Sequence, residues 1–164
     1  MKQKQNKKAF SKLIQKNQAI IHKITRVYEN GWVDREDLFQ EICLQLWKSY
    51  PNFREEAQFS TWMYRVALNT AINQTRRPGL LFDRSSPPEI PYDPADAYQL
   101  SEEIQILYKA ISQLRKVEKA IILLWLEEKS YEEIAGAIGI TVKNVSVKLV
   151  RIRAMLTEII AKLQ

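Results

Sequence analysis

The chain has 164 residues, of which 46% are hydrophobic and 27% charged, a balance that excludes a disordered protein and fits one ordinary domain or two small ones. The longest apolar run, Ala120 to Leu126, is much shorter than the ~20 residues that span a bilayer, and the N-terminus lacks the apolar core of a signal peptide. Cys43 is the only cysteine, so no internal disulfide can form, as is usual in a reducing cytosol. We therefore expect a soluble, cytoplasmic protein.

The formal net charge of +6 favours polyanionic partners such as DNA, RNA or an anionic membrane surface. The charge is unevenly placed, because residues 1–20 contain six lysines and the first carboxylate is Glu29. This basic N-terminal arm either contacts phosphate groups or is a solvated, frayed end, and the sequence leaves both interpretations open.

The first half of the chain shows apolar residues at helical spacing, without the alternation of a β-strand. Ser60 is expected to cap the last of its helices, which Pro78-Gly79 would stop. The spacing predicts helices over about 10–29, 34–49 and 60–77, with a turn at Asn30-Gly31 and a loop from Tyr50 to Phe59.

A proline-rich segment follows these helices. Five of the six prolines lie between residues 78 and 94, and proline removes the backbone amide hydrogen and disfavours helix in the preceding residue. The segment therefore predicts a linker between two small helical domains, and the fold class is all-α. We place the domains at residues 1–79 and 101–164, with the linker at 80–100.

In the second half, helices are predicted over about 101–113, 116–127, 131–138 and 142–162. Ser130 and Glu133 have the spacing of a capping box, in which each side chain bonds the other residue's backbone amide. Gly139 supplies a left-handed turn, and Thr141 caps the next helix. A helix, a glycine-containing turn and a capped helix predict a DNA-binding helix-turn-helix.

The last helix has two different faces. An apolar stripe from Val145 to Ile159 is expected to pack inward, and no acidic residue occurs between Thr141 and Thr157. Lysine and arginine pair with phosphate or guanine, asparagine pairs with adenine, and valine contacts the thymine methyl group. This pattern favours DNA binding over a polar face that is merely solvated. The candidate DNA contacts are Thr141, Lys143, Asn144, Val147, Lys148 and Arg151.

The helix after Ser60 places aromatic, arginine and asparagine side chains on one side. Such a mixture suits single-stranded or melted nucleic acid, because bases stack on rings while guanidinium groups bind the backbone. The alternative is that Trp62 and Tyr64 are core aromatics with polar tips. The row consists of Trp62, Arg65, Asn69, Asn73 and Arg76.

The helix over 34–49 is expected to bury Leu38, Phe39, Ile42 and Leu46. Leu44 and Trp47 lie one turn apart on its outer side, which indicates a protein-docking surface. The alternative is that Trp47 folds under the following loop. The outer residues are Asp37, Gln40, Glu41, Leu44, Trp47 and Lys48.

These motifs together resemble a known family. The segment Asp37–Ile42 with Leu46-Trp47, and Phe59–Ala67 with Asn69 and Arg76-Arg77, resemble region 2 of sigma factors of the sigma-70 superfamily. Ser130–Ala135 with Gly139, Thr141, Val145, Leu149, Arg151 and Leu156 resembles region 4. The order of the motifs, the linker and the length match the extracytoplasmic-function (ECF) group, which keeps only these two regions.

The resemblance implies roles for all three surfaces. The helix over 34–49 would dock on the clamp helices of the largest subunit of the bacterial RNA polymerase core, and the core's flap is a further expected partner. The helix after Thr141 would bind the minus-thirty-five promoter element. An anti-sigma factor is a common partner in the family. Minus-ten contacts would come from Asn52, Phe53, Ser60, Thr61, Trp62, Arg65, Asn69, Asn73, Arg76 and Arg77.

The sequence departs from the family pattern at the entry to region 4. The family often has Leu-Pro there with an arginine four residues after the proline, whereas here Arg115 follows Leu114 and Lys119 stands at the later position. No metal-ligand spacing, phosphate loop or nucleophile near His22 indicates an enzyme, and no cofactor or small-molecule substrate is expected. The main alternative is a conventional helix-turn-helix regulator of duplex operator DNA.

Overall fold

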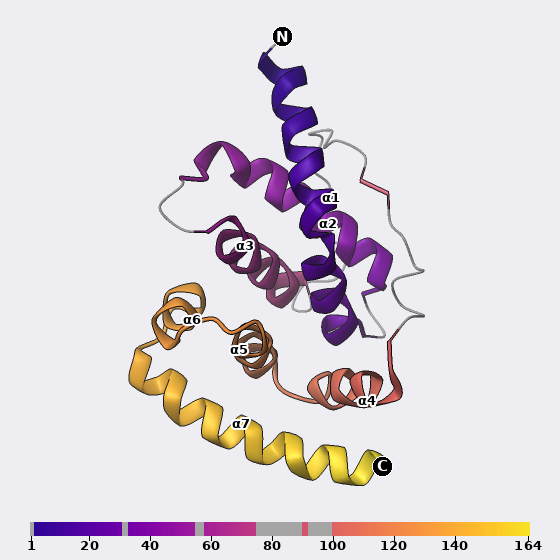
Figure 1. The fold of residues 1–164 in the computed structure, drawn as a ribbon, viewed down its shortest axis with the longest axis vertical. Coiled ribbons are helices and arrows are strands. Elements are labelled where there is room, and N and C mark those ends of the chain that lie inside the picture. The colour runs from indigo at the N-terminus through magenta and orange to yellow at the C-terminus, as the bar shows by residue number, and fades with distance from the viewer. Residues whose placement is uncertain (1, 31–32, 55–57, 75–89, 92–99) are drawn as a thin grey trace. The chain divides into compact units, whose positions relative to one another are not determined.

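The computed structural model describes the chain except residues 1, 31–32, 55–57, 75–89 and 92–99. All of the elements in the described part are helices, which confirms the all-α class (Figure 1). The chain divides into two compact units, Met1–Asp96 and Ala97–Gln164. None of the described helices is both long and apolar enough to cross a membrane.

The first unit consists of α1 (Lys2–Tyr28), α2 (Arg35–Ser49), a 3₁₀ turn η1 (Tyr50–Asn52) and α3 (Phe59–Gln74), and its three α-helices pack pairwise on one another. Their shared core is apolar and close to fully buried, as expected for helices that each carry one apolar stripe. Its largest members include Phe10, Ile14, Ile21, Ile24, Leu38, Phe39, Ile42, Leu46, Met63 and Leu68.

Helix α1 begins at Lys2 and not near residue 10, so the basic arm is not a frayed end. The added segment is rich in lysine and glutamine and has no glycine or proline, so helix propensity carries the helix beyond its apolar stripe. At the other end, the Asn30 carboxamide accepts a hydrogen bond from the Val33 amide at 2.9 Å. Arg35 forms a two-point ion pair with Glu29, at 3.1 and 3.2 Å, which joins the end of α1 to the start of α2.

Helix α3 starts one residue earlier than predicted. The Gln58 carbonyl accepts from the Trp62 amide at 3.2 Å, which places Ser60 inside the helix, so the prediction that Ser60 is its N-cap is wrong. The predicted loop after α2 contains η1, which the Phe53 amide closes on the Tyr50 carbonyl at 3.0 Å. The end of the predicted helix at Arg76-Arg77 lies outside the described residues.

The second unit consists of α4 (Glu102–Ile111), α5 (Lys116–Leu126), α6 (Tyr131–Ile138) and α7 (Val142–Leu163). Helix α7 packs against each of the other three helices and is therefore the central helix of the unit. All four lie within two residues of their predicted bounds, because local caps define most of their ends. The Ser101 hydroxyl, for example, accepts from the Ile104 amide at the start of α4.

Candidate nucleic-acid interface

The turn between α6 and α7 has the geometry that the sequence predicts. The Glu133 amide donates to the Ser130 hydroxyl at 3.1 Å, and the Ser130 amide donates to the Glu133 carboxylate at 3.2 Å. Gly139 ends α6 with a φ of 84°, a left-handed conformation that suits glycine. The Thr141 hydroxyl then accepts from the Asn144 amide at 3.1 Å and starts α7. These contacts build the helix-turn-helix.

Small residues in α6 do not all mark a close helix approach. Ala135 is buried, but Gly136 is exposed, and a Cβ atom at Gly136 would meet no other atom within 4 Å. No neighbouring helix among the described residues therefore requires a small residue at Gly136. Ile140, in the turn itself, is half-buried.

Helix α7 separates its two faces as predicted. Val145, Leu149 and Ile152 are at most 2% exposed and Leu156 is 7% exposed, whereas Ile159 is half-buried near the C-terminal end. Every candidate DNA contact on this helix and its cap, Thr141, Lys143, Asn144, Val147, Lys148 and Arg151, is exposed. The exposed face therefore presents cations and hydrogen-bonding groups without a carboxylate.

Two further residues of α7, Val150 and Arg153, lie outside the set of candidate DNA contacts predicted from the sequence. Val150 is 70% exposed, the highest value among the exposed large hydrophobic side chains, and stands three residues after Val147 on the same side of the helix. The three-residue spacing of Val147 and Val150 is the sequence signal that could have identified Val150 as part of the exposed face. Arg153 lies over the ring of Trp125 in α5, 5.0 Å from its centroid, so it ties α7 to α5 through a cation–π contact.

In the first unit, aromatic side chains gather where the loop after α2 meets the start of α3. The Trp62 ring centroid lies 5.0 Å from that of Phe53, 5.4 Å from Phe59 and 6.4 Å from Tyr50. Trp62 stays half-buried, so it packs on the loop and keeps part of its ring accessible. Tyr64, in contrast, is 1% exposed, and for this residue the core interpretation is correct.

Beyond the aromatic cluster, α3 presents a polar row to solvent. Arg65, Asn69 and Asn73 recur every four residues and are all exposed, so they occupy one side of the helix. Asn52 is exposed, whereas Phe53, Ser60 and Thr61 are half-buried. Arg76 and Arg77, which extend this row in the sequence, lie outside the described residues.

The outer side of α2 is less uniform than the sequence suggested. Asp37, Gln40 and Lys48 are exposed and Leu44 is half-buried. Trp47 is half-buried because Phe10 of α1 meets its ring edge-on, with centroids 5.1 Å apart, and Phe10 also meets Tyr50 at 5.3 Å. Trp47 is therefore covered in part by Phe10 of α1 and exposed in part at the surface.

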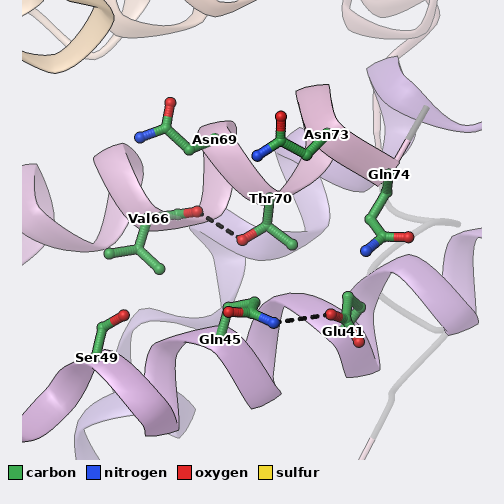
Figure 2. A pocket seen from close by; sticks show the side chains of 8 residues that line it. All are labelled: Glu41, Gln45, Ser49, Val66, Asn69, Thr70, Asn73 and Gln74. Atoms are coloured by element: carbon green, nitrogen blue, oxygen red, sulfur yellow. Dashed lines mark hydrogen bonds between the residues drawn. The ribbon is translucent and has the colours of Figure 1, made fainter. Parts of the chain in front are cut away.

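Glu41 is only 7% exposed, so the prediction that it lies on the outer side of α2 is wrong. Its carboxylate accepts from the Gln45 amide nitrogen at 3.0 Å, inside a groove of about 340 Å³ between α2 and α3 (Figure 2). Ser49 on α2 and Val66 and Thr70 on α3 line the same groove, and the Asn69 and Asn73 amides stand along the α3 side. Most of the lining residues are polar but none is a cation, which disfavours phosphate there.

Cys43 and His22 have the surroundings of core residues. Burial raises the pKa of the Cys43 thiol to about 12, which suppresses the reactive thiolate at neutral pH. His22 is 6% exposed and stacks on Phe39 with ring centroids 5.0 Å apart. Neither residue is placed for chemistry with a solvent-borne substrate.

Comparison with known proteins matches both units. The family model Sigma-70 region 2 matches residues 13–79, and the family model Sigma-70, region 4 matches residues 104–156. The ECF RNA polymerase sigma-E factor of Escherichia coli K12 is 32% identical over 174 aligned positions, which cover 92% of this chain and 86% of that protein. The Haemophilus influenzae sigma-E factor is also 32% identical, in an alignment that covers 94% of this chain and 88% of that protein.

Solved structures share the fold at lower sequence identity. The sigma factor RpoE from Bartonella quintana, solved in complex with the anti-sigma factor NepR, has a TM-score of 0.70 at 20% identity and covers 94% of this chain and 98% of its own. CnrH, solved in complex with the cytosolic domain of CnrY, has a TM-score of 0.64 at 21% identity, over 94% of this chain and 89% of its own.

Proposed function

Because this chain belongs to the ECF sigma factors of the sigma-70 family, we propose that it docks on the bacterial RNA polymerase core and carries it to promoters through the surfaces described above. The observation that supports this assignment of surfaces is that one chain presents two chemically different faces. The aromatic and amide face of α3 suits unpaired bases, and the acid-free face of α7 suits duplex DNA.

For the minus-thirty-five element, α7 would lie in the major groove. Its exposed cations can pair with phosphate or guanine, Asn144 can pair with adenine, and Val147 can contact a thymine methyl group. The buried stripe on the opposite side supports this orientation, because it fixes which side of the helix is available. The set is Thr141, Lys143, Asn144, Val147, Lys148 and Arg151.

For the minus-ten element, the loop after α2 and the exposed row of α3 would hold the melted non-template strand. Trp62, packed on Phe53 and Phe59, offers a ring whose position is fixed before a base arrives. Unstacking a base costs a few kcal/mol, which stacking on a ring and hydrogen bonds to the base edge can offset without ATP. The set is Asn52, Phe53, Ser60, Thr61, Trp62, Arg65, Asn69 and Asn73, extended by Arg76 and Arg77.

For the polymerase core, α2 would contact the clamp helices of the largest subunit, and the second unit would meet the flap. Trp47 and Leu44 supply apolar area, and Asp37, Gln40 and Lys48 supply a polar rim of the kind that surrounds interface cores. Glu41 would take part only through the groove between α2 and α3, since its side chain is buried.

We further place the functional domains at residues 1–79 and 101–164, joined by the linker 80–100, and the protein in the cytoplasm, where the polymerase and the chromosome are. We infer that it is not an enzyme in its own right. An anti-sigma factor is a further expected partner, since the sigma factor RpoE, which shares the fold, has been solved in complex with the anti-sigma factor NepR.

Transcription in vitro tests the assignment of function. Purified chain is mixed with sigma-free bacterial core polymerase and a fragment library of its own genome. Initiation at a discrete set of start sites, absent without the chain, is the expected result and also yields the promoter motif. If the chain instead bound duplex DNA saturably by itself and supported no initiation, a conventional helix-turn-helix regulator would be the better assignment.

A further inference from the structure

A second basic feature of the helix-turn-helix unit adjoins the candidate DNA-contact face of α7 and shares two of its cations, Lys148 and Arg151. A cavity of about 430 Å³ opens between the start of α5 and the middle of α7. Lys148 and Arg151, three residues apart and so on one side of α7, form one wall. The other wall consists of Arg115, Lys116, Val117 and Glu118 at the start of α5.

The charge in this cavity is strongly one-sided. Four of the six lining side chains are cationic, and the only carboxylate, Glu118, already accepts a hydrogen bond from the Arg115 backbone amide at 3.1 Å. Burial, and to a lesser extent the positive charge of Lys116, lowers the pKa of neighbouring Lys119, so the start of α5 carries closely spaced cations. A cavity of this kind attracts an anion, and the five-donor guanidinium groups of Arg115 and Arg151 suit a phosphate oxygen.

We propose that Arg115 and Lys116 form a phosphate clamp with Lys148 and Arg151, which holds a backbone phosphate of the duplex that α7 reads. The proposal rests on the proposed function, because it assumes that α7 lies on upstream promoter DNA. A phosphate bound by Lys148 and Arg151 would come within reach of the α5 side chains, since all four line one cavity. The clamp is particular to this chain in that Arg115 stands where the family often has proline.

The test measures how binding of the reconstituted holoenzyme to a promoter fragment depends on salt. Each neutralised phosphate contributes roughly 0.9 to the slope of log affinity against log salt concentration. The double variant Arg115→Gln/Lys116→Gln should lower the slope by about 1 and weaken binding by a similar factor on promoters that differ in their minus-thirty-five sequence. Arg115→Lys/Lys116→Arg keeps both charges and should retain the slope.

Lys162→Ala is the matched control, because it removes an exposed lysine near the far end of α7 and should leave the slope unchanged. An unchanged slope in the double variant, with wild-type holoenzyme bound normally, would overturn the clamp while leaving the proposed function intact. Wild-type holoenzyme that gave no upstream protection would instead contradict the proposed function. If the slope were unchanged but inorganic phosphate at constant ionic strength shifted the NMR signals of Arg115 and Lys116, the cavity would bind a free anion and not DNA.

Discussion

The two glycines of α6 and the following turn should respond oppositely to the same chemical change. A Cβ atom at Gly136 meets nothing within 4 Å, so Gly136→Ala should stabilise the fold by about 1 kcal/mol through higher helix propensity. Gly139 has a φ of 84°, and alanine in this left-handed region costs roughly 1–2 kcal/mol. The two variants should therefore differ in stability by about 2–3 kcal/mol, although each gains a single methyl group.

Denaturant unfolding followed by circular dichroism measures this difference directly. If the unfolding free energy of both variants falls with denaturant concentration at the same slope, only stability has changed. Because Gly136 is exposed and lies outside α7, Gly136→Ala should also bind upstream duplex DNA as the wild type does. Equal effects of the two substitutions would refute the reasoning, since they would mean that Gly139 does not need its left-handed conformation. Destabilisation by Gly136→Ala would likewise show that another element packs against it.

Three further variants or reagents test the other surfaces. Trp47→Ala should weaken core-polymerase binding by roughly 30-fold in a pull-down titration, as for an interface hot spot of about 2 kcal/mol. The control Phe10→Leu removes the same ring contact from the α1 side and should retain affinity. Equal affinities of Trp47→Ala and wild type would rule out the docking role. Arg151→Ala should shorten or weaken upstream footprints and lower the slope of log affinity against log salt concentration by about 0.9. Unchanged upstream protection would contradict the assignment of α7 to the major groove. The Cys43 thiol should resist a thiol-specific reagent at pH 8 until the chain unfolds, because its pKa is raised to about 12. Rapid labelling of the folded chain would contradict the burial of Cys43. Because the pKa of this thiol is raised, the free energy of unfolding should be independent of its ionisation below the ordinary thiol pKa of 9.0. It should fall as pH rises above 9.0, since only the unfolded chain then ionises.

Local chemistry explains why the second unit was predicted closely. The Ser130–Glu133 box, the left-handed Gly139 and the Thr141 cap each act over three or four residues, so neighbouring residues determine where α6 ends and α7 begins. The apolar stripe of α7 is equally local, because its members recur at the helical period. The same logic failed at Ser60, where the helix starts one residue earlier on the Gln58 carbonyl.

Residue type and spacing along single helices are enough to predict the fold class, the caps of the second unit, the two family regions and the exposed basic face of α7. Residues at the edge of an apolar stripe, in contrast, have surroundings that depend on how the helices pack on one another. Glu41 and Trp47 both stand beside the buried face of α2, where periodicity does not reveal which neighbour covers them; α3 encloses the first in a groove, and Phe10 of α1 meets the second. The basic cavity between α5 and α7 has the same origin, because its walls come from segments about 30 residues apart that only packing brings together.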